Sequence, residues 1–139
     1  MGRKKYGILL TTMLIVSFAL IACNNGTTET RSIPSEYRGK WQTTKMQFAG
    51  DDTIYTIPFT IEGVSILSHG YEVGDNFVKF YSNGSLQQIL QNLYLVGNSV
   101  YDSSGPNGAT IQVSGDDLIL TDPGGGKNYC KKVTKFSWE

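Results

Sequence analysis

The sequence predicts an all-β fold, a small up-and-down antiparallel barrel of about eight strands, and three observations support it. Apolar and polar residues alternate with a period of two along most of the chain after residue 33. Turn signals built from Gly, Asn and Asp recur at intervals of about ten residues. The 139 residues include 16 Gly and 8 Tyr, with 40% apolar and 17% charged residues, which is typical of a folded domain rich in turns. A β-sandwich is the alternative that such short strands allow.

The first half of the domain predicts strands separated by turns. Their residues are mainly β-branched and aromatic, and we expect them at 41–48, 54–61, 64–68 and 77–81. In the second of these strands, Tyr55, Ile57, Phe59 and Ile61 form one apolar face. Pro58 interrupts this strand without an amide donor and therefore indicates an edge or a bulge.

The segment that follows breaks the alternation and predicts a short helix near 85–92. Its apolar residues fall at helical spacing, with Ser85 as a candidate N-cap and Gly97 beyond the end: Leu86, Ile89, Leu90, Leu93 and Val96. The helix would run into a strand near 93–96, and an all-strand structure is the alternative.

The last part of the chain predicts a hairpin and a final strand. Residues 109–114 and 117–121 flank Gly115-Asp116, the strongest two-residue hairpin signal in the chain. Gly124 to Gly126 form a turn that opens a strand at 128–133.

The amino terminus has the pattern of a signal peptide. Arg3, Lys4 and Lys5 precede a mostly apolar run that ends at Cys23, too short and wrongly flanked for a stable membrane span. The end of the run, Leu20-Ile21-Ala22-Cys23, resembles the bacterial lipobox. That resemblance implies diacylglyceryl transfer to the Cys23 sulfur, cleavage before Cys23, and acylation of the new amino group by a fatty acid such as palmitate. Residues 1–22 are then a lipoprotein signal peptide. The alternatives are an uncleaved anchor helix or an ordinary signal peptide with a coincidental Cys.

Cleavage changes the charge and the cysteine chemistry of the chain. The precursor has 12 basic and 12 acidic residues, whereas the chain from Cys23 has lost three basic residues and carries a net charge of −3. This charge excludes nucleic-acid binding through a basic face. Once Cys23 is lipidated, Cys130 has no disulfide partner and is expected as a small buried residue. The polar residues 23–32 predict a flexible tether.

A short motif at the start of the domain suggests a family. Gly39-Lys40-Trp41, after Pro34-Ser35-Glu36-Tyr37, resembles the Gly-x-Trp signature of lipocalins, and the chain is similar to small lipocalin-like lipoproteins of spirochaetes. The resemblance implies a lipocalin-like barrel over 33–139, with Trp41 packed across its closed end beneath a one-turn helix. It also implies a cation stacked on Trp41, supplied by Lys131, Lys132 or Lys135.

Motifs for catalysis or metal binding are missing from the sequence. His69 is the only His, which excludes a His-based metal triad, and we expect it to be a surface or hydrogen-bonded structural residue. Asp51-Asp52 and Asp116-Asp117 occupy turn positions, where Asp bonds to its own backbone. We therefore expect no catalytic residue, no metal and no cofactor.

The remaining functional candidates are apolar. Six residues are expected to line or fill the barrel interior: Tyr55, Ile57, Phe59, Ile61, Phe77 and Phe80. Such stripes form a packed core more often than a ligand pocket, and a cavity would suit a small hydrophobic molecule. We expect a non-enzymatic protein held on the cell envelope by the lipid on Cys23, in the outer membrane if the source has one, because Asn24 and not Asp follows the Cys. The alternative is a protein-interaction module that contacts an envelope or host protein or acts as a protease inhibitor.

Overall fold

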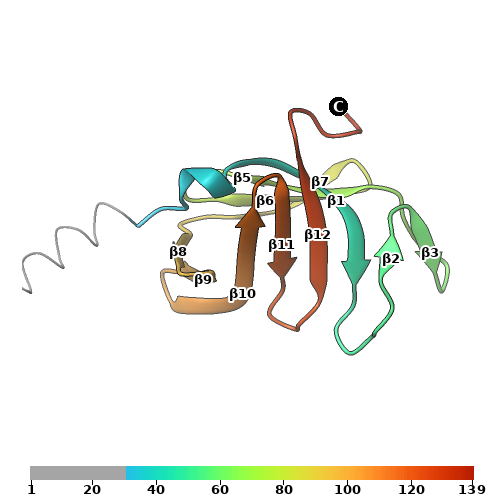
Figure 1. Cartoon of the computed structure of the whole chain (residues 1–139), viewed down its shortest axis with the longest axis horizontal. Coiled ribbons are helices and arrows are strands. Elements are labelled where there is room, and N and C mark those ends of the chain that lie inside the picture. The colour runs from blue at the N-terminus through green and yellow to red at the C-terminus, as the bar shows by residue number, and fades with distance from the viewer. Residues whose placement is uncertain (1–30) are drawn as a thin grey trace, which may run out of the picture. The chain divides into compact units, whose positions relative to one another are not determined.

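The computed structural model describes residues 31–139, and a curled antiparallel sheet dominates it (Figure 1). A single turn of 3-10 helix, η1 (Ser35–Tyr37), precedes the first strand. The strands are β1 (Gly39–Gln47), β2 (Tyr55–Thr56), β3 (Phe59–Ile61), β4 (Val64–Ile66), β5 (His69–Val73), β6 (Val78–Ser82), β7 (Ser85–Leu90), β8 (Tyr94–Val96), β9 (Ser99–Asp102), β10 (Gly105–Ser114), β11 (Asp117–Thr121) and β12 (Lys127–Val133).

Nine of these strands follow one another around the sheet in the order β7-β6-β5-β1-β12-β11-β10-β9-β8. We call this set the meander. Every pairing within it is antiparallel, and β1, the first strand of the chain, pairs in the middle of the sheet with β12, the last. Strands β7 and β8 form the two ends of the sheet, so the barrel-like curl is open between them. The predicted all-β, up-and-down, barrel-like fold is confirmed.

The predicted helix near 85–92 is wrong, because these residues form β7. Strand β7 pairs with β6 from Ser82↔Ser85 to Val78↔Leu90, and Asn83 and Gly84 make the tight turn with positive φ angles of 51° and 81°. An Asn-Gly turn of this kind matches the twist of a two-stranded hairpin. The apolar residues at helical spacing do not share a buried face, because every residue of β7 is exposed.

The predicted strand at 54–61 is divided in the structure. Strand β2 pairs with the later half of β1, the chain leaves the sheet at Ile57-Pro58, and β3 pairs only with β4 in a separate hairpin. Proline cannot donate to a strand ladder, so pairing stops there. The first half of β1 pairs instead with β5, a strand that the alternation pattern missed because His and Gly are weak strand formers. Strand β9 was also missed.

Trp41 fills one end of the curled sheet, and its side chain is fully buried. Its indole Nε1 donates a 2.8 Å hydrogen bond to the carbonyl oxygen of Tyr37 in η1. The Nζ of Lys132 lies 5.1 Å from the centre of the Trp41 ring. The expected one-turn helix and the expected cation over Trp41 are therefore both present, and Lys132 supplies the cation.

The chain after β12 crosses the outside of the sheet. Phe136 is buried there and stacks on Trp138 with ring centres 4.4 Å apart, and both rings contact Tyr81. Lys40 forms an ion pair with Glu139, whose carboxylate also accepts the Phe136 amide. This C-terminal segment, residues 134–139, thus covers the strands β1, β5 and β6.

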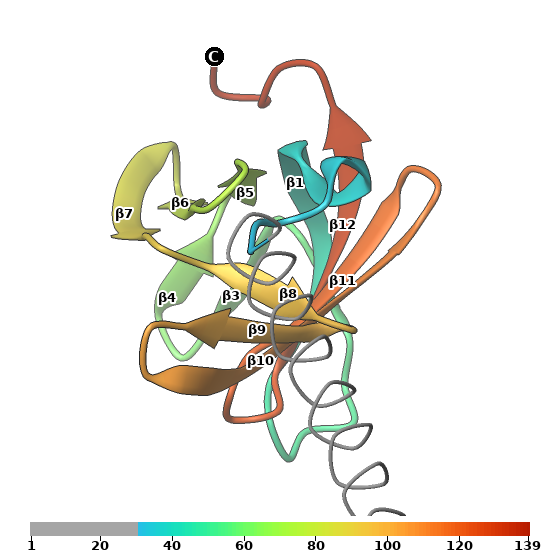
Figure 2. The same ribbon diagram turned by 90° about the vertical axis from the view of Figure 1, so that its left-hand side faces the viewer.

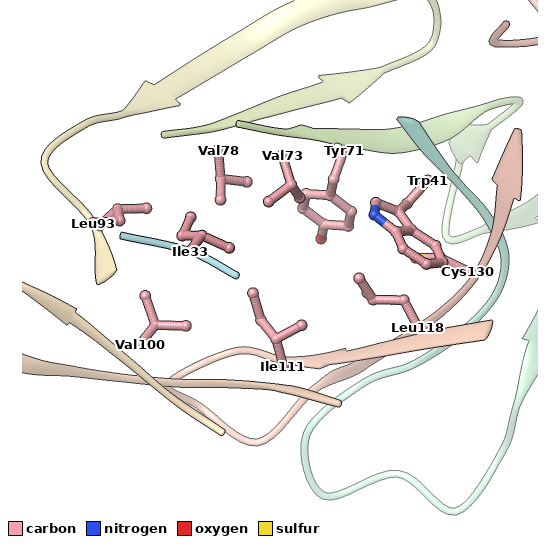
Figure 3. Packing of buried hydrophobic residues seen from close by; sticks show 10 residues of the cluster. All are labelled: Ile33, Trp41, Tyr71, Val73, Val78, Leu93, Val100, Ile111, Leu118 and Cys130. Carbon is pink, nitrogen blue, oxygen red and sulfur yellow. The ribbon is translucent and has the colours of Figure 1, made fainter. Parts of the chain in front are cut away.

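One compact unit spans Ser32–Glu139 and holds every residue of the hydrophobic core. Figure 3 shows ten core residues facing one another from opposite sides of the curl, with Ile33 between them. Because the core lies wholly within this unit, we refer to Ser32–Glu139 as the domain. None of the helical segments in residues 31–139 has the length and apolar character needed to cross a bilayer.

Candidate functional site

A cavity of about 470 Å³ occupies the inside of the curled sheet. Eight strands of the meander contribute side chains to its wall, and Leu93 adds a further one from the β7–β8 connection. Most of the lining residues are apolar, among them Met46, Val78, Phe80, Leu90, Leu93, Val100, Ala109, Ile111 and Leu120. Sheets that curl around a hollow of this size and character are typical ligand-binding sites.

The wall has a buried floor and an exposed rim. Val78, Leu93, Val100 and Ile111 on the floor are each less than a tenth exposed, and Figure 3 shows them pointing toward one another across the curl. The rim residues are exposed, and they come from β7 and from the turn before β12: Gln88, Leu90, Asp122 and Pro123. In Figure 2, β7 lies at one side of the curl and β8 and β9 cross its face. The cavity is therefore exposed to solvent at this rim and closed at its floor.

His69 brings a polar group into the wall. It is 3% exposed, and its Nδ1 lies 2.8 Å from the Oγ1 of Thr43, which in turn lies 3.4 Å from the Sγ of Cys130. Burial lowers the pKa of His69 to about 4, so the ring is neutral at neutral pH. Burial also raises the pKa of Cys130 to about 12. The predictions of a hydrogen-bonded structural His and a buried Cys130 are confirmed.

Two further polar side chains of the lining are buried, whereas Gln88, Asn107 and Asp122 are partly or fully exposed. Asn128 is 5% exposed, and its Oδ1 has no hydrogen-bond partner among the described residues. Tyr71 is also buried, and burial raises the pKa of its hydroxyl, which therefore stays protonated. The rings of His69, Tyr71 and Phe80 contact one another, with centres 4.7 to 5.6 Å apart. The wall thus combines an aromatic cluster with a few buried polar atoms.

The charged groups of the cavity are few. Its lining includes no Lys and no Arg, and Asp122 at the rim is its one carboxylate. The Oδ1 of Asp122 accepts hydrogen bonds from the amides of Gly124 and Gly126, which hold the turn. In the part of the chain from 31 to 139, no group of three or more His, Cys, Asp or Glu residues is placed to bind a metal.

The structure separates the six residues that the sequence placed in the barrel interior. Phe80 lines the cavity. Tyr55, Phe59 and Ile61 instead lie together in a shallower surface pocket of about 460 Å³ beside the β3–β4 hairpin, where Tyr55 and Phe59 stack at 5.1 Å. The prediction for these three residues is wrong. Alternation along a strand shows that one face is apolar, but it does not show which part of the molecule that face packs against.

The other two residues of that set are also outside the cavity lining. Ile57 lies in the connection between β2 and β3, where its amide bonds to the Thr44 carbonyl. Phe77 is half-buried just before β6, with the Nζ of Lys79 5.5 Å from its ring centre. The motif residues Gly39 and Trp41 lie at the filled end, while Leu20, Ile21, Ala22 and Cys23 lie outside the described residues.

The sequence did not identify most of the wall. Tyr71 and His69 belong to the missed strand β5, and Asn128 is the second residue of β12. Its cross-strand neighbours, Met46 and Leu120, are apolar, but these pairings are known only from the structure, so no sequence signal marked Asn128. Comparison of the chain with protein-family models, with curated proteins and with solved structures finds no match.

Proposed function

We propose that this protein is a non-enzymatic, lipid-anchored protein of the cell envelope whose lipocalin-like domain binds a small, mainly apolar molecule. The observation that carries the binding part of this proposal is the cavity inside the curled sheet. Its volume of about 470 Å³ lies in the range of small-molecule sites, which are mostly apolar with a few placed polar groups. A filled interior would have favoured a scaffold for protein contacts instead.

The domain also has both features that a carrier needs, a packed end and a cavity. Trp41, whose indole bonds to the Tyr37 carbonyl in η1, packs the filled end, so part of the buried core lies outside the cavity lining. The hollow part then remains available to a guest, whose burial contributes about 25 cal/mol per Å² of apolar surface removed from water. This is the physical basis for binding an apolar molecule at an envelope.

The experiment is native mass spectrometry of the domain taken from its own envelope, released by a protease site placed in residues 24–31. We expect a reproducible mass increment above the bare domain. The variant Ala109→Trp, which fills the cavity from its wall, removes the increment, whereas Ala49→Trp, at an exposed turn, keeps it. A domain that is always ligand-free would contradict the carrier proposal.

The anchor is supported by the sequence alone, through the lipobox-like residues that end at Cys23. Acyl chains contribute about 0.8 kcal/mol per buried methylene, and several chains on one residue give a lasting attachment. Cys23→Ser should leave the precursor uncleaved and unlabelled by a fatty-acid probe, while Cys130→Ser should be labelled normally. Labelling of Cys23→Ser would refute the assignment.

A second function, protein interaction, is favoured by the open edge of β7. Leu86 and Ile89 are more than 40% exposed on this strand, and its outer edge has no strand partner in the described part of the chain. Unpaired apolar edges are common sites for strand addition. The double variant Leu86→Lys and Ile89→Lys separates the two functions. It would abolish crosslinking of a protein partner to β7, and it would leave unchanged the ligand mass seen by native mass spectrometry.

A further inference from the structure

The polar atoms of the cavity narrow the class of ligand. We infer that the ligand is an uncharged amphiphile with a hydrogen-bond donor, such as a long-chain alcohol, whose donor group bonds to the Asn128 side chain. This inference rests on the proposed function, since it concerns the same cavity. Three features of the wall lead to it: an unpaired buried acceptor, the absence of a cation, and an apolar floor.

The acceptor is Oδ1, the side-chain amide oxygen of Asn128. Residues that face each other across a ladder point to the same side of a sheet, and Asn128 faces Met46 on β1 and Leu120 on β11. All three line the cavity, so the Asn128 side chain lies on the inner face of the sheet. Its Oδ1 is buried and has no partner among the described residues. Because χ2 of Asn is broad, the terminal amide can turn its oxygen toward a donor in the cavity.

An unpaired buried acceptor is unusual, because more than nine in ten buried polar groups have a partner. Leaving one unsatisfied costs the free energy of its lost hydration, and a ligand that donates to it recovers part of that cost on binding. A hydroxyl group at the end of an apolar chain supplies such a donor. An ether of the same size supplies none and leaves the Asn128 oxygen unpaired.

The absence of a cation disfavours the most common alternative, a fatty acid carboxylate. No Lys or Arg lines the cavity, and the buried ring of His69 is neutral at neutral pH. A carboxylate placed on the floor would be an isolated buried charge, which is very costly. Asp122 at the rim adds a negative charge on the path of entry. The wall therefore favours neutral ligands over anionic ones.

The test uses the domain and three probes built on a ten-carbon chain: decanol, decyl methyl ether and decanoate. Displacement of an environment-sensitive fluorophore from the cavity, at neutral pH and below the solubility limit or micelle concentration of each probe, gives their affinities. We expect decanol to bind about tenfold more tightly than the ether, which corresponds to one satisfied hydrogen bond. Decanoate should bind more weakly than both.

Two variants test whether the preference for decanol over the ether comes from the Asn128 side chain. In Asn128→Leu, which keeps the size of the side chain, decanol and the ether should bind within about twofold of each other. Gln87→Leu is the matched control, because it removes an exposed amide of β7 that is not part of the cavity lining and should keep the full preference. The comparison of the three probes on the unmodified domain stands even if Asn128→Leu fails to fold.

The outcomes distinguish the inference about the donor group from the proposed function of the cavity as a binding site. Tight binding of the ether or of decanoate, equal to that of decanol, would overturn the inference about the donor and leave the cavity as a binding site. A preference for decanol that persists in Asn128→Leu would also overturn it. Failure of all three probes to displace the fluorophore, together with a ligand-free domain from the envelope, would contradict the proposed function itself.

Discussion

The ammonium nitrogen of Lys132 lies 5.1 Å from the centre of the Trp41 ring, and the two residues face each other across the pairing of β12 with β1. Gly39 makes room for this contact. A Cβ atom at Gly39 would lie 3.1 Å from the Cε of Lys132, and the φ angle of +126° at Gly39 disfavours any other residue. The Gly-x-Trp pattern thus has a local cause. Gly39 leaves room for the aliphatic part of the Lys132 side chain, and the Trp41 ring lies beneath the Lys132 ammonium group.

The first prediction concerns this contact. A double-mutant cycle of Lys132→Met and Trp41→Phe should give a coupling free energy of about 1 kcal/mol, within the range of partly exposed cation–π pairs. Urea denaturation of the domain measures it. The same cycle with Lys131→Met, whose ammonium pairs with Asp117, should give coupling near zero. Equal coupling in both cycles would show that the Lys132 contact has no specific energy.

Trp41 itself should dominate the stability of the filled end. Trp41→Ala should lower the free energy of unfolding by about 3–5 kcal/mol, because it removes the largest fully buried side chain and leaves a void. Leu67→Ala, at a side chain that is 64% exposed, is the control and should change it by less than about 0.5 kcal/mol. An unchanged urea midpoint for Trp41→Ala would contradict its placement in the core.

His69 should make the domain less stable in mild acid. The folded state holds the pKa of His69 at about 4, below the value of 6.5 in the unfolded chain. Between these pH values the unfolded state takes up a proton that the folded state does not, so stability falls as the pH falls. From pH 7 to pH 5 the loss should be about 2 kcal/mol.

The control for this prediction is His69→Gln, since His69 is the only His in the sequence. Its stability should change much less over the same pH range. Below pH 5, the carboxylates of Asp51 and Glu139, whose pKa values hydrogen bonds lower, add a loss of the same sign. A profile for the unmodified domain as flat as that of His69→Gln would show that His69 is not buried as a neutral ring.

Gly70 should be required for docking of the C-terminal segment. A Cβ at Gly70 would lie 2.8 Å from Phe136, and 3.0 Å from both the Trp138 ring and the Trp41 carbonyl oxygen. Gly70→Ala should therefore destabilise the domain by about 1–3 kcal/mol, as overpacking does. Gly124→Ala meets its nearest atom at 3.4 Å and should be nearly neutral. Removal of residues 134–139 should reduce the cost of Gly70→Ala; an undiminished cost would mean that the segment does not press on Gly70.

Cys130 should be unreactive until the domain unfolds. Its thiol is 3% exposed and its pKa is raised to about 12 by burial, so almost no thiolate is present at pH 8. A chromogenic thiol reagent should label the domain only at urea concentrations within the unfolding transition. Rapid labelling in native buffer would contradict the burial of Cys130.

The local patterns of the sequence were sufficient for the fold class and the filled end. Alternation and turn residues predicted the hairpin of β10 and β11, because Gly115-Asp116 fits the twist of its strands. The family resemblance carried by Gly39-Lys40-Trp41 implied the buried Trp beneath a helical turn and the cation above it. These features depend on residues that are close in sequence or directly paired.

The cavity depended on information that no local pattern contains. The residues around Tyr55 and Phe59 alternate as well as those of any strand in the meander, yet they cover a separate surface pocket, because Pro58 ends the pairing of β2. The residues 85–90 show helical spacing, yet the Asn83-Gly84 turn returns them along β6. In both segments a turn between elements outweighed the periodicity within an element.

Local sequence patterns were enough to predict the all-β class and the residues of the filled end, and the lipid anchor is a proposal that rests on the amino-terminal pattern. The hollow interior, and the places of Asn128, His69 and Tyr71 in its wall, follow from the arrangement of the strands in space. A cavity is the difference between the space that the curled sheet encloses and the volume of the side chains that point inward. That difference is set by strand order, bulges and register together, and these bring residues from both ends of the domain into one wall.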